Sequence, residues 1–160
     1  MIGILTGPTG SGKTTQLEKW VADKENVAGI LMPVLAGERY LYSIYTGKLV
    51  PVETGEDSPP DQVVKIGKFI FSRRVFDWGN KEIIAGFNDR RTVIIDEIGP
   101  LELNGEGFAP ALHTILANKN RLNEIDLILV VRDGLVDQVT EYFKITEYDV
   151  IASPEQTEII

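Results

Sequence analysis

The feature that most constrains this chain is a stretch of eight residues near its start, GPTGSGKT at positions 7–14. It satisfies the pattern G-x-x-x-x-G-K-[ST] in full, and it lies between a short apolar run and a stretch with helical spacing. Glycines allow the backbone to fold tightly and to present successive N–H groups to phosphate oxygens. The N-terminus of the following helix adds unsatisfied N–H groups and a partial positive charge. The sequence therefore predicts a phosphate-binding loop that joins a strand to a helix.

The loop and the residue after it supply the predicted phosphate contacts. We expect the Lys13 ammonium to reach the β- and γ-phosphates of a nucleotide, and the Thr14 hydroxyl to coordinate Mg²⁺ as cofactor. The complete predicted nucleotide-binding set comprises Gly7, Pro8, Thr9, Gly10, Ser11, Gly12, Lys13, Thr14 and Thr15.

Beyond the loop, apolar patterns of strand type and of helix type alternate along the chain. The predicted strands are 2–6, 27–34, 66–72, 92–95, 127–131 and 149–152. The predicted helices are 13–24, 74–87, 108–118 and 135–143. This alternation predicts an α/β fold with three α/β/α layers, in which helices cover both faces of a mostly parallel central sheet of five core strands.

Two segments depart from the alternation. Residues 39–52 place side chains alternately on two faces around Thr46-Gly47-Lys48, which predicts an added β-hairpin. Residues 54–61 (TGEDSPPD) combine a glycine, two prolines and three acids, which is typical of a loop. A length of 160 residues suits one domain, so we expect a single domain over residues 1–160.

A second motif follows at residues 93–97, where the run VIIDE ends an apolar strand in two acids. In phosphate-loop enzymes such an Asp holds Mg²⁺, and an adjacent acid orients or deprotonates the attacking water. Successive side chains of an extended backbone point to opposite sides, so we assign the metal to Asp96 and the water to Glu97. The pair favours a RecA-like order for a P-loop NTPase sheet, in which strand 127–131 lies between the first strand and strand 92–95.

Composition narrows the range of ligands and partners. Sixteen basic against twenty-four acidic residues give a net charge of −8, which disfavours general nucleic-acid binding. The chain has no cysteine and one histidine, His113, which argues against thiolate and histidine-cluster metal sites and against a Ser-His-Asp hydrolase. No apolar run approaches the roughly 20 residues of a membrane span, and the start lacks the features of a signal peptide. We therefore expect a cytoplasmic protein with no membrane partner.

Several stretches carry a resemblance to a known family. Residues 95–103 (IDEIGPLEL) resemble the D-E-I-G-x-[ML]-E signature of the THEP-type nucleoside triphosphatases, the group that includes the cancer-related nucleoside triphosphatase. The loop GPTGSGKTT lies at the same distance from the N-terminus as in that family, and IGKF at residues 66–69 is similar to its V-G-x-Y segment. The resemblance covers the chain from residue 1 to about 120. It implies a cytosolic Mg²⁺-dependent enzyme that hydrolyses several nucleoside triphosphates, ATP and GTP among them, with modest base selectivity.

Three arginines are candidates for the positive charge that stabilises the transition state. Arg132 follows a buried strand, where it could act on the γ-phosphate; an ordinary surface pairing with a neighbouring acid is the alternative. Arg39 is similar to the family's arginine in the hairpin region, and Arg73 opens a basic doublet that could serve as a lid. Glu102 belongs to the signature, and the sequence does not distinguish a structural role from a supporting one.

Together these features predict metal-assisted hydrolysis of a nucleoside triphosphate. Loop amides and Lys13 bind the phosphates, and Thr14 and Asp96 position Mg²⁺. Glu97 aligns a water with the γ-phosphorus, and Arg132 is the third predicted catalytic residue beside Lys13 and Glu97. Two alternatives stay open, a kinase-type phosphotransferase that acts on a small acceptor and a non-catalytic nucleotide-dependent switch. An acceptor that accelerates ATP loss favours the first, and slow turnover that responds only to a partner protein favours the second.

Overall fold

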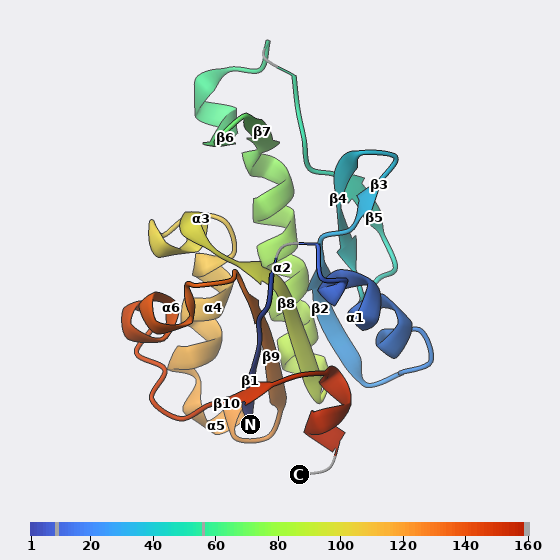
Figure 1. Cartoon of the computed structure of the whole chain (residues 1–160), viewed down its shortest axis with the longest axis vertical. Helices are drawn as coiled ribbons and strands as arrows, with labels where there is room; N and C mark the ends of the chain where they lie inside the picture. The colour runs from blue at the N-terminus through green and yellow to red at the C-terminus, as the bar shows by residue number, and fades with distance from the viewer. Residues whose placement is uncertain (9, 56, 159–160) are drawn as a thin grey trace.

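Strands and helices alternate along the chain much as the sequence predicts (Figure 1), in a computed structural model that describes residues 1–8, 10–55 and 57–158. The strands are β1 (Ile2–Leu5), β2 (Val27–Leu31), β3 (Val34–Leu35), β4 (Glu38–Ser43), β5 (Leu49–Pro51), β6 (Val63–Ile66), β7 (Phe69–Ser72), β8 (Thr92–Ile98), β9 (Asp126–Val131) and β10 (Asp149–Ile151). The helices are α1 (Lys13–Val21), α2 (Arg73–Asp89), α3 (Pro100–Leu103), α4 (Ala109–Ala117), α5 (Lys119–Leu122) and α6 (Val136–Tyr142), with 3-10 turns η1 (Pro60–Gln62) and η2 (Pro154–Glu158). Within the described ranges, no helix has the length and apolar character that a membrane span requires.

The central sheet has the order β10-β1-β9-β8-β2-β4-β3, with β5 paired to β4. Neighbours from β10 to β2 are parallel, and β4 is antiparallel to β2. The predicted order is confirmed, because β9 pairs with β1 on one side and with β8 on the other. The carboxyl ends of β1 and β8 therefore open at the same edge of the sheet, which is where ligands of parallel α/β sheets bind.

Alternate residues of the central strands enter two separate cores, one on each face of the sheet. Ile94 of β8 packs in the core that contains Leu17 and Trp20 of α1. Val93 and Ile95, its neighbours in the same strand, pack in the core that contains the buried side chains of α2, α4 and α6. Because both faces are covered, β8 and β9 are apolar at successive positions instead of every second one. The three-layer α/β/α prediction is thus confirmed.

The predicted hairpin at residues 39–52 is confirmed as β4 and β5, which pair with Tyr42 opposite Leu49. Since β4 also pairs with β2, the hairpin extends the central sheet at one edge. The strand predicted at 27–34 is shorter, because β2 ends at Leu31 and Pro33 precedes the two-residue strand β3. Proline has no N–H for a strand ladder, so it separates the two strands.

The single strand predicted at residues 66–72 is wrong, because this segment contains a turn. β6 and β7 form a separate antiparallel hairpin, with Ile66 opposite Phe69 and a turn at Gly67 and Lys68. Gly67 has φ 55°, in the left-handed region that tight hairpin turns use and that glycine adopts readily. The hairpin stands beyond the central sheet at the start of α2 (Figure 1), near the edge where β1 and β8 end.

Candidate functional site

The predicted phosphate loop lies between β1 and α1. The Ser11 N–H donates to the Pro8 carbonyl at 3.1 Å and closes the turn. Gly12 precedes the helix with φ 85°, a left-handed conformation that glycine adopts readily and other residues rarely adopt. The first N–H groups of α1 consequently face the loop, where they can bind an anion. Thr9, also in the predicted nucleotide-binding set, lies outside the described residues.

The Lys13 side chain folds back over the loop. Its Nζ donates to the carbonyls of Gly7 at 2.8 Å and Pro8 at 3.1 Å, and to Ser11 Oγ at 3.3 Å. These contacts hold the ammonium on the inner side of the loop, close to the start of α1. Two predicted loop residues, Gly7 and Pro8, thereby position the lysine through their carbonyl groups.

Asp96 and Thr14 meet at the base of the loop, although 82 positions separate them in the sequence. The Thr14 hydroxyl donates to Asp96 Oδ2 at 2.7 Å, and the Met32 N–H donates to the same oxygen at 3.3 Å. The Asp96 side chain is buried. Two oxygen groups of the kind that Mg²⁺ prefers thus lie side by side, as the sequence predicts for this pair.

The electrostatics of Asp96 suit a cation. Burial raises its pKa to about 6, against the opposing effect of the hydrogen bonds from Thr14 and Met32. A divalent ion beside the carboxylate would offset this burial. The described residues contain no cluster of three or more His, Cys, Asp or Glu side chains arranged for a metal. Mg²⁺ in phosphate sites needs only one or two protein oxygens besides phosphate and water, so the Thr14–Asp96 pair fits it.

Two cavities open beside this pair. The first, the loop cavity, has a volume of about 600 Å³ and is lined by Gly10, Ser11, Gly12, Lys13, Thr14, Thr15, Glu18, Met32, Pro33, Val34, Leu35, Arg39, Asp96, Glu97 and Arg132. The second, the aromatic pocket, has a volume of about 230 Å³ and takes its apolar wall from Met32, Phe69, Phe71, Phe76 and Phe108. Met32, Arg39, Glu97 and Arg132 line both cavities.

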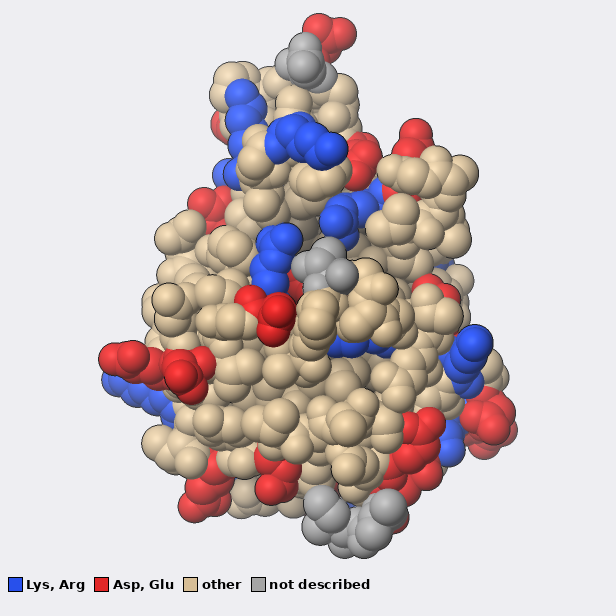
Figure 2. All heavy atoms as spheres, viewed as in Figure 1, with Lys and Arg blue, Asp and Glu red and all other residues tan. Residues whose placement is uncertain are grey.

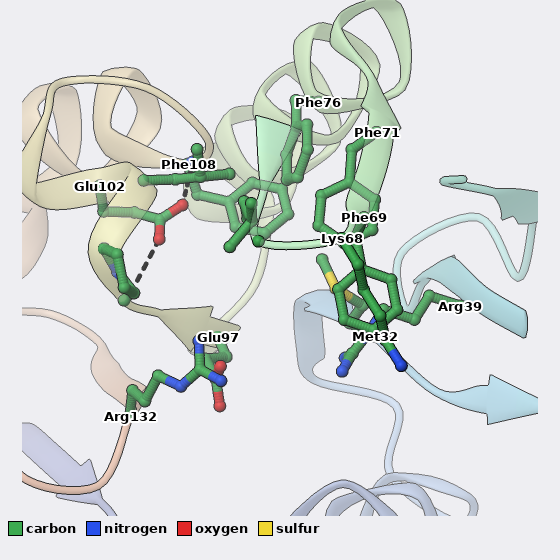
Figure 3. A pocket seen from close by; sticks show the side chains of 15 residues that line it. Met32, Arg39, Lys68, Phe69, Phe71, Phe76, Glu97, Glu102, Phe108 and Arg132 are labelled. Carbon is green, nitrogen blue, oxygen red and sulfur yellow. Dashed lines mark hydrogen bonds between the residues drawn. The ribbon is translucent and has the colours of Figure 1, made fainter. Parts of the chain in front are cut away.

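Glu97 lies where the two cavities meet. It follows the buried Asp96 in β8 but is itself only partly buried, and it lines the aromatic pocket together with Arg132, with both side chains below the phenylalanine rings in Figure 3. The two acids of the pair thus lie in different surroundings, and the assignment of the metal to one and the water to the other stays a prediction. Asp96 contacts Thr14 beneath the loop, whereas Glu97 lines the space beyond it.

Arg132 and Arg39 line the same two cavities from different parts of the sheet. Arg132 follows β9, and its backbone N–H donates to the Ile98 carbonyl at 3.0 Å. No ion pair joins the Arg132 side chain to an acid anywhere in ranges 1–8, 10–55 and 57–158, so the surface pairing weighed from the sequence is not seen there. Arg39, on β4, lies over the Phe69 ring at 5.2 Å from its centroid. Both arginines are thus available to negative charge in either cavity.

Arg73 and His113 lie elsewhere. Arg73, the first residue of α2, donates to the Val63 carbonyl at 3.2 Å and pairs with Glu106 at 3.4 Å. The first contact ties α2 to the β6–β7 hairpin and the second ties it to the segment before α4, and Arg73 lines neither cavity. His113 is exposed on α4, with its ring 4.8 Å from the ring of Phe143.

Glu102 has a structural role that the sequence left open. Its Oε1 accepts from the Gly99 N–H at 2.8 Å and its Oε2 accepts from the Phe108 N–H at 2.9 Å (Figure 3). Burial raises its pKa to about 7. Gly107, with φ 59°, leaves room for the carboxylate, since a Cβ there would lie 1.8 Å from Oε2. Glu102 therefore holds the segment that carries Phe108 into the aromatic pocket.

The aromatic pocket and Lys68 were missed from the sequence. Lys68 lies in the β6–β7 turn and lines the pocket with Phe69, which stacks on Phe71 at 5.8 Å between centroids. Phe76 and Phe108 complete the wall from α2 and from the loop before α4, with their ring centroids 5.1 Å apart. The only hint of the pocket in the sequence was the short segment IGKF at residues 66–69, and it did not indicate which distant residues pack beside it.

Charge on this face is uneven in spite of the net negative charge. Figure 2 shows Lys and Arg side chains over the β6–β7 end of the molecule and just below it, and acidic side chains along the lower edge. Of the cationic residues, Lys13, Arg39 and Arg132 line the loop cavity. Arg39, Lys68 and Arg132 line the aromatic pocket. Three acidic residues also line the loop cavity, so its cations offer contacts to a small polyanion without giving the cavity a net positive charge.

Comparison with known proteins gives a consistent result. The model of a family described as NTPase matches residues 3–153. The fold is similar to that in the crystal structure of THEP1 from the hyperthermophile Aquifex aeolicus, with a TM-score of 0.71. The two sequences are 21% identical, and the match covers 100% of this chain and 94% of the other. No curated protein matches the sequence.

Proposed function

The chain belongs to the NTPase family, and from this membership we propose that it hydrolyses nucleoside 5′-triphosphates, ATP and GTP among them, to the diphosphate and phosphate with Mg²⁺ as cofactor. The resemblance to the THEP-type nucleoside triphosphatases, first seen in the signature residues, is confirmed. The family match extends to residue 153, further than the 120 or so residues that carry the resemblance.

The triphosphate binds along the phosphate loop. Backbone N–H groups from Gly10 to Thr15 face its oxygens at the start of α1, where the helix dipole favours negative charge. Lys13 exchanges its contacts with the Gly7 and Pro8 carbonyls for the β- and γ-phosphate oxygens. This exchange is favourable because a hydrogen bond between two charged groups is stronger than one to a neutral carbonyl.

Thr14 and Asp96 hold Mg²⁺ next to the phosphates. A Mg²⁺ ion held by this pair would supply neutralisation of the negative charge on the phosphate groups. Asp96 keeps a negative charge for this purpose when the ion lowers its raised pKa. Thr14 would offer its hydroxyl oxygen to the ion from the first turn of α1, next to the Asp96 carboxylate.

Glu97 orients the attacking water. Its carboxylate accepts a hydrogen bond from a water in line with the γ-phosphorus and receives the proton as the water adds. Arg132 and Arg39, which line the same cavity, stabilise the charge that develops on the γ-phosphate oxygens. Base selectivity is low in this proposal, since these contacts all go to phosphate groups.

One observation carries the proposal. The Thr14–Asp96 hydrogen bond of 2.7 Å joins the phosphate loop to the acidic end of β8, directly beside Glu97. Two motifs distant in sequence thus form one site with a place for a metal, a place for phosphates and a base.

The test is phosphate release from ATP, GTP, CTP and UTP, each with Mg²⁺ and with EDTA. We expect turnover of several of them, with Mg²⁺ required in every case. Thr14→Val removes the hydroxyl at nearly constant volume and should lower turnover at least tenfold, whereas Thr14→Ser keeps the hydroxyl and should retain most of it. Turnover that is independent of Mg²⁺, or equal in the two variants, would overturn the assignment of the metal site.

A further inference from the structure

The aromatic pocket exceeds what hydrolysis requires. A cavity that holds one water needs a volume of about 10–15 Å³, whereas the pocket has a volume of about 230 Å³. Phe71, Phe76 and Phe108 are buried in its wall, and Phe69 and Met32 are partly buried (Figure 3). A cavity with aromatic walls and a few polar groups at one side is the usual form of a site for a small organic molecule.

The pocket opens toward the reacting groups. Glu97, Arg39 and Arg132 line it as well as the loop cavity, so the two spaces share the wall that carries the proposed base. A molecule in the aromatic pocket therefore has its polar end beside Glu97, on the side of the loop cavity where the γ-phosphate is proposed to lie. Lys68 adds a further positive charge to the lining of the aromatic pocket.

The shape and chemistry of the walls select the occupant. Phe69 and Phe71 stack with an interplanar angle of 6°, while Phe76 and Phe108 meet edge to face at 61°. Walls of this kind favour a flat aromatic ring, which adds stacking and edge contacts to the burial of apolar surface. The volume is below the range for drug-sized ligands, roughly 300–1,000 Å³, so the occupant is small.

We propose that the aromatic pocket binds a second substrate, a small molecule with a flat aromatic body and an alcohol group, which accepts the γ-phosphoryl group in place of water. The inference rests on the proposed nucleotide site, because the alcohol is positioned by the base assigned there. Hydrolysis is then the reaction of the enzyme when the pocket contains water.

The transfer balances without another reactant. The alcohol oxygen forms a bond to the γ-phosphorus while the bond from that phosphorus to the β,γ-bridging oxygen breaks. Glu97 receives the alcohol proton, and the nucleoside diphosphate leaves with the electron pair of the broken bond. The products are a phosphate monoester and the diphosphate, and Glu97 later returns its proton to solvent.

The experiment uses the full-length protein with Mg²⁺ and γ-labelled ATP. The probes are benzyl alcohol, cytidine and adenosine, and the matched non-aromatic alcohols are cyclohexylmethanol and ribose. Two quantities are measured, namely the ratio of labelled ester to labelled phosphate, and binding of each alcohol by calorimetry with Mg²⁺ and a non-hydrolysable ATP analogue. We expect at least one aromatic alcohol to bind and to raise the ratio at least tenfold above its non-aromatic counterpart.

Two variants tie the effect to the pocket. Phe69→Ala removes a partly buried ring, and Ile66→Trp fills the pocket from the β6 side. Each variant should lower the ratio of labelled ester to labelled phosphate at least tenfold. Ile66→Trp removes no aromatic ring from the wall, so it provides the test if Phe69→Ala does not fold. Tyr142→Ala is the control, because Tyr142 is an exposed aromatic residue on α6 that lines neither cavity.

The possible results separate the two proposals. The acceptor pocket is overturned if the protein releases phosphate from MgATP but neither binds an aromatic probe nor transfers phosphate to one. That result leaves the proposed hydrolysis standing. Equal ratios for aromatic and non-aromatic alcohols also overturn it, since the rings then have no part in selection. If the protein forms no ester and releases no phosphate from ATP, GTP, CTP or UTP, the proposed function itself is overturned.

Discussion

The loop cavity and the aromatic pocket share the wall at Glu97 but are built in opposite ways. Six successive residues, Gly10 to Thr15, line the loop cavity. The aromatic pocket is assembled from Met32 just after β2, from β7, from α2 and from the segment before α4, and its key contacts are between side chains. The difference teaches that phosphate chemistry can be encoded in one contiguous motif, because backbone N–H groups perform it. A cavity shaped by side chains requires the packing of distant segments.

The two buried acids, Asp96 and Glu102, also differ in the groups that surround them. Asp96 accepts from a hydroxyl of the phosphate loop and lies beside the loop cavity, where it is available to a cation. Glu102 accepts backbone N–H groups at both carboxylate oxygens and holds the loop that carries Phe108. Both have a pKa raised by burial, so the raised pKa alone does not distinguish a reactive acid from a structural one. The hydrogen-bond partners distinguish them.

The strongest test of the contrast is Glu97→Gln at the shared wall. The amide keeps the shape but accepts no proton, so we expect turnover to fall by about 10²–10⁴. The affinity for MgATP, measured by calorimetry, should change by no more than about threefold, because the binding contacts are those of the loop. Glu141→Gln, at an exposed position on α6, is the control. A Glu97→Gln enzyme with the rate of the wild type would remove Glu97 from the mechanism.

The second-largest expected effect is on nucleotide binding in the loop cavity. Lys13→Ala removes the ammonium that bonds to the Gly7 and Pro8 carbonyls, and with it the proposed contact to the phosphates. We expect the Kd for MgATP to rise about a hundredfold, in line with the loss of a charged hydrogen-bonding group from a site. Lys65→Ala, at an exposed position on β6, should leave the Kd unaltered. Equal affinities of the two variants would mean that the lysine does not bind phosphate.

The structural acid is tested by the pH dependence of stability. Burial raises the pKa of Glu102 from 4.5 to about 7, so the folded protein holds this proton more tightly than the unfolded chain. The resulting stabilisation is fully present below about pH 4.5 and is lost as the pH rises to about 7, a change of about 3 kcal/mol. Urea unfolding of the wild type and of Glu102→Gln should show their difference falling by this amount over that range. A difference that is constant with pH would contradict the raised pKa.

The smallest effect tests how the loop that carries Phe108 is held. Gly107 and Gly105 both have positive φ, but a Cβ at Gly107 would lie 1.8 Å from Glu102 Oε2, whereas at Gly105 the closest atom is Tyr142 Oη at 3.7 Å. Both substitutions to alanine carry the same kind of backbone strain. Gly107→Ala should lower the free energy of unfolding by about 1–3 kcal/mol more than Gly105→Ala does. Equal losses in urea unfolding would show that Glu102 can move aside freely.

Much of the fold could be predicted because its determinants are local. Successive apolar residues in β8 and β9 indicated strands buried on both faces, and the Asp-Glu pair indicated the order of β1, β9 and β8. The turn at Gly67 was missed, because the apolar residues on both sides of it read as one strand. The short helices α3 and α5 were missed as well, since four residues are too few for a helical period to be visible.

The sequence by itself determined the phosphate loop, the Asp-Glu pair at the end of a central strand and the layered α/β class, because each depends on residues close together in the chain. Only the tertiary structure decided that Glu102 is a structural tie, that Arg73 braces the hairpin, and that Lys68 and the phenylalanine rings line one pocket with Glu97. These assignments depend on which side chains pack across distant segments. Packing of that kind follows from the shape of the whole core, and no short stretch of the sequence contains it.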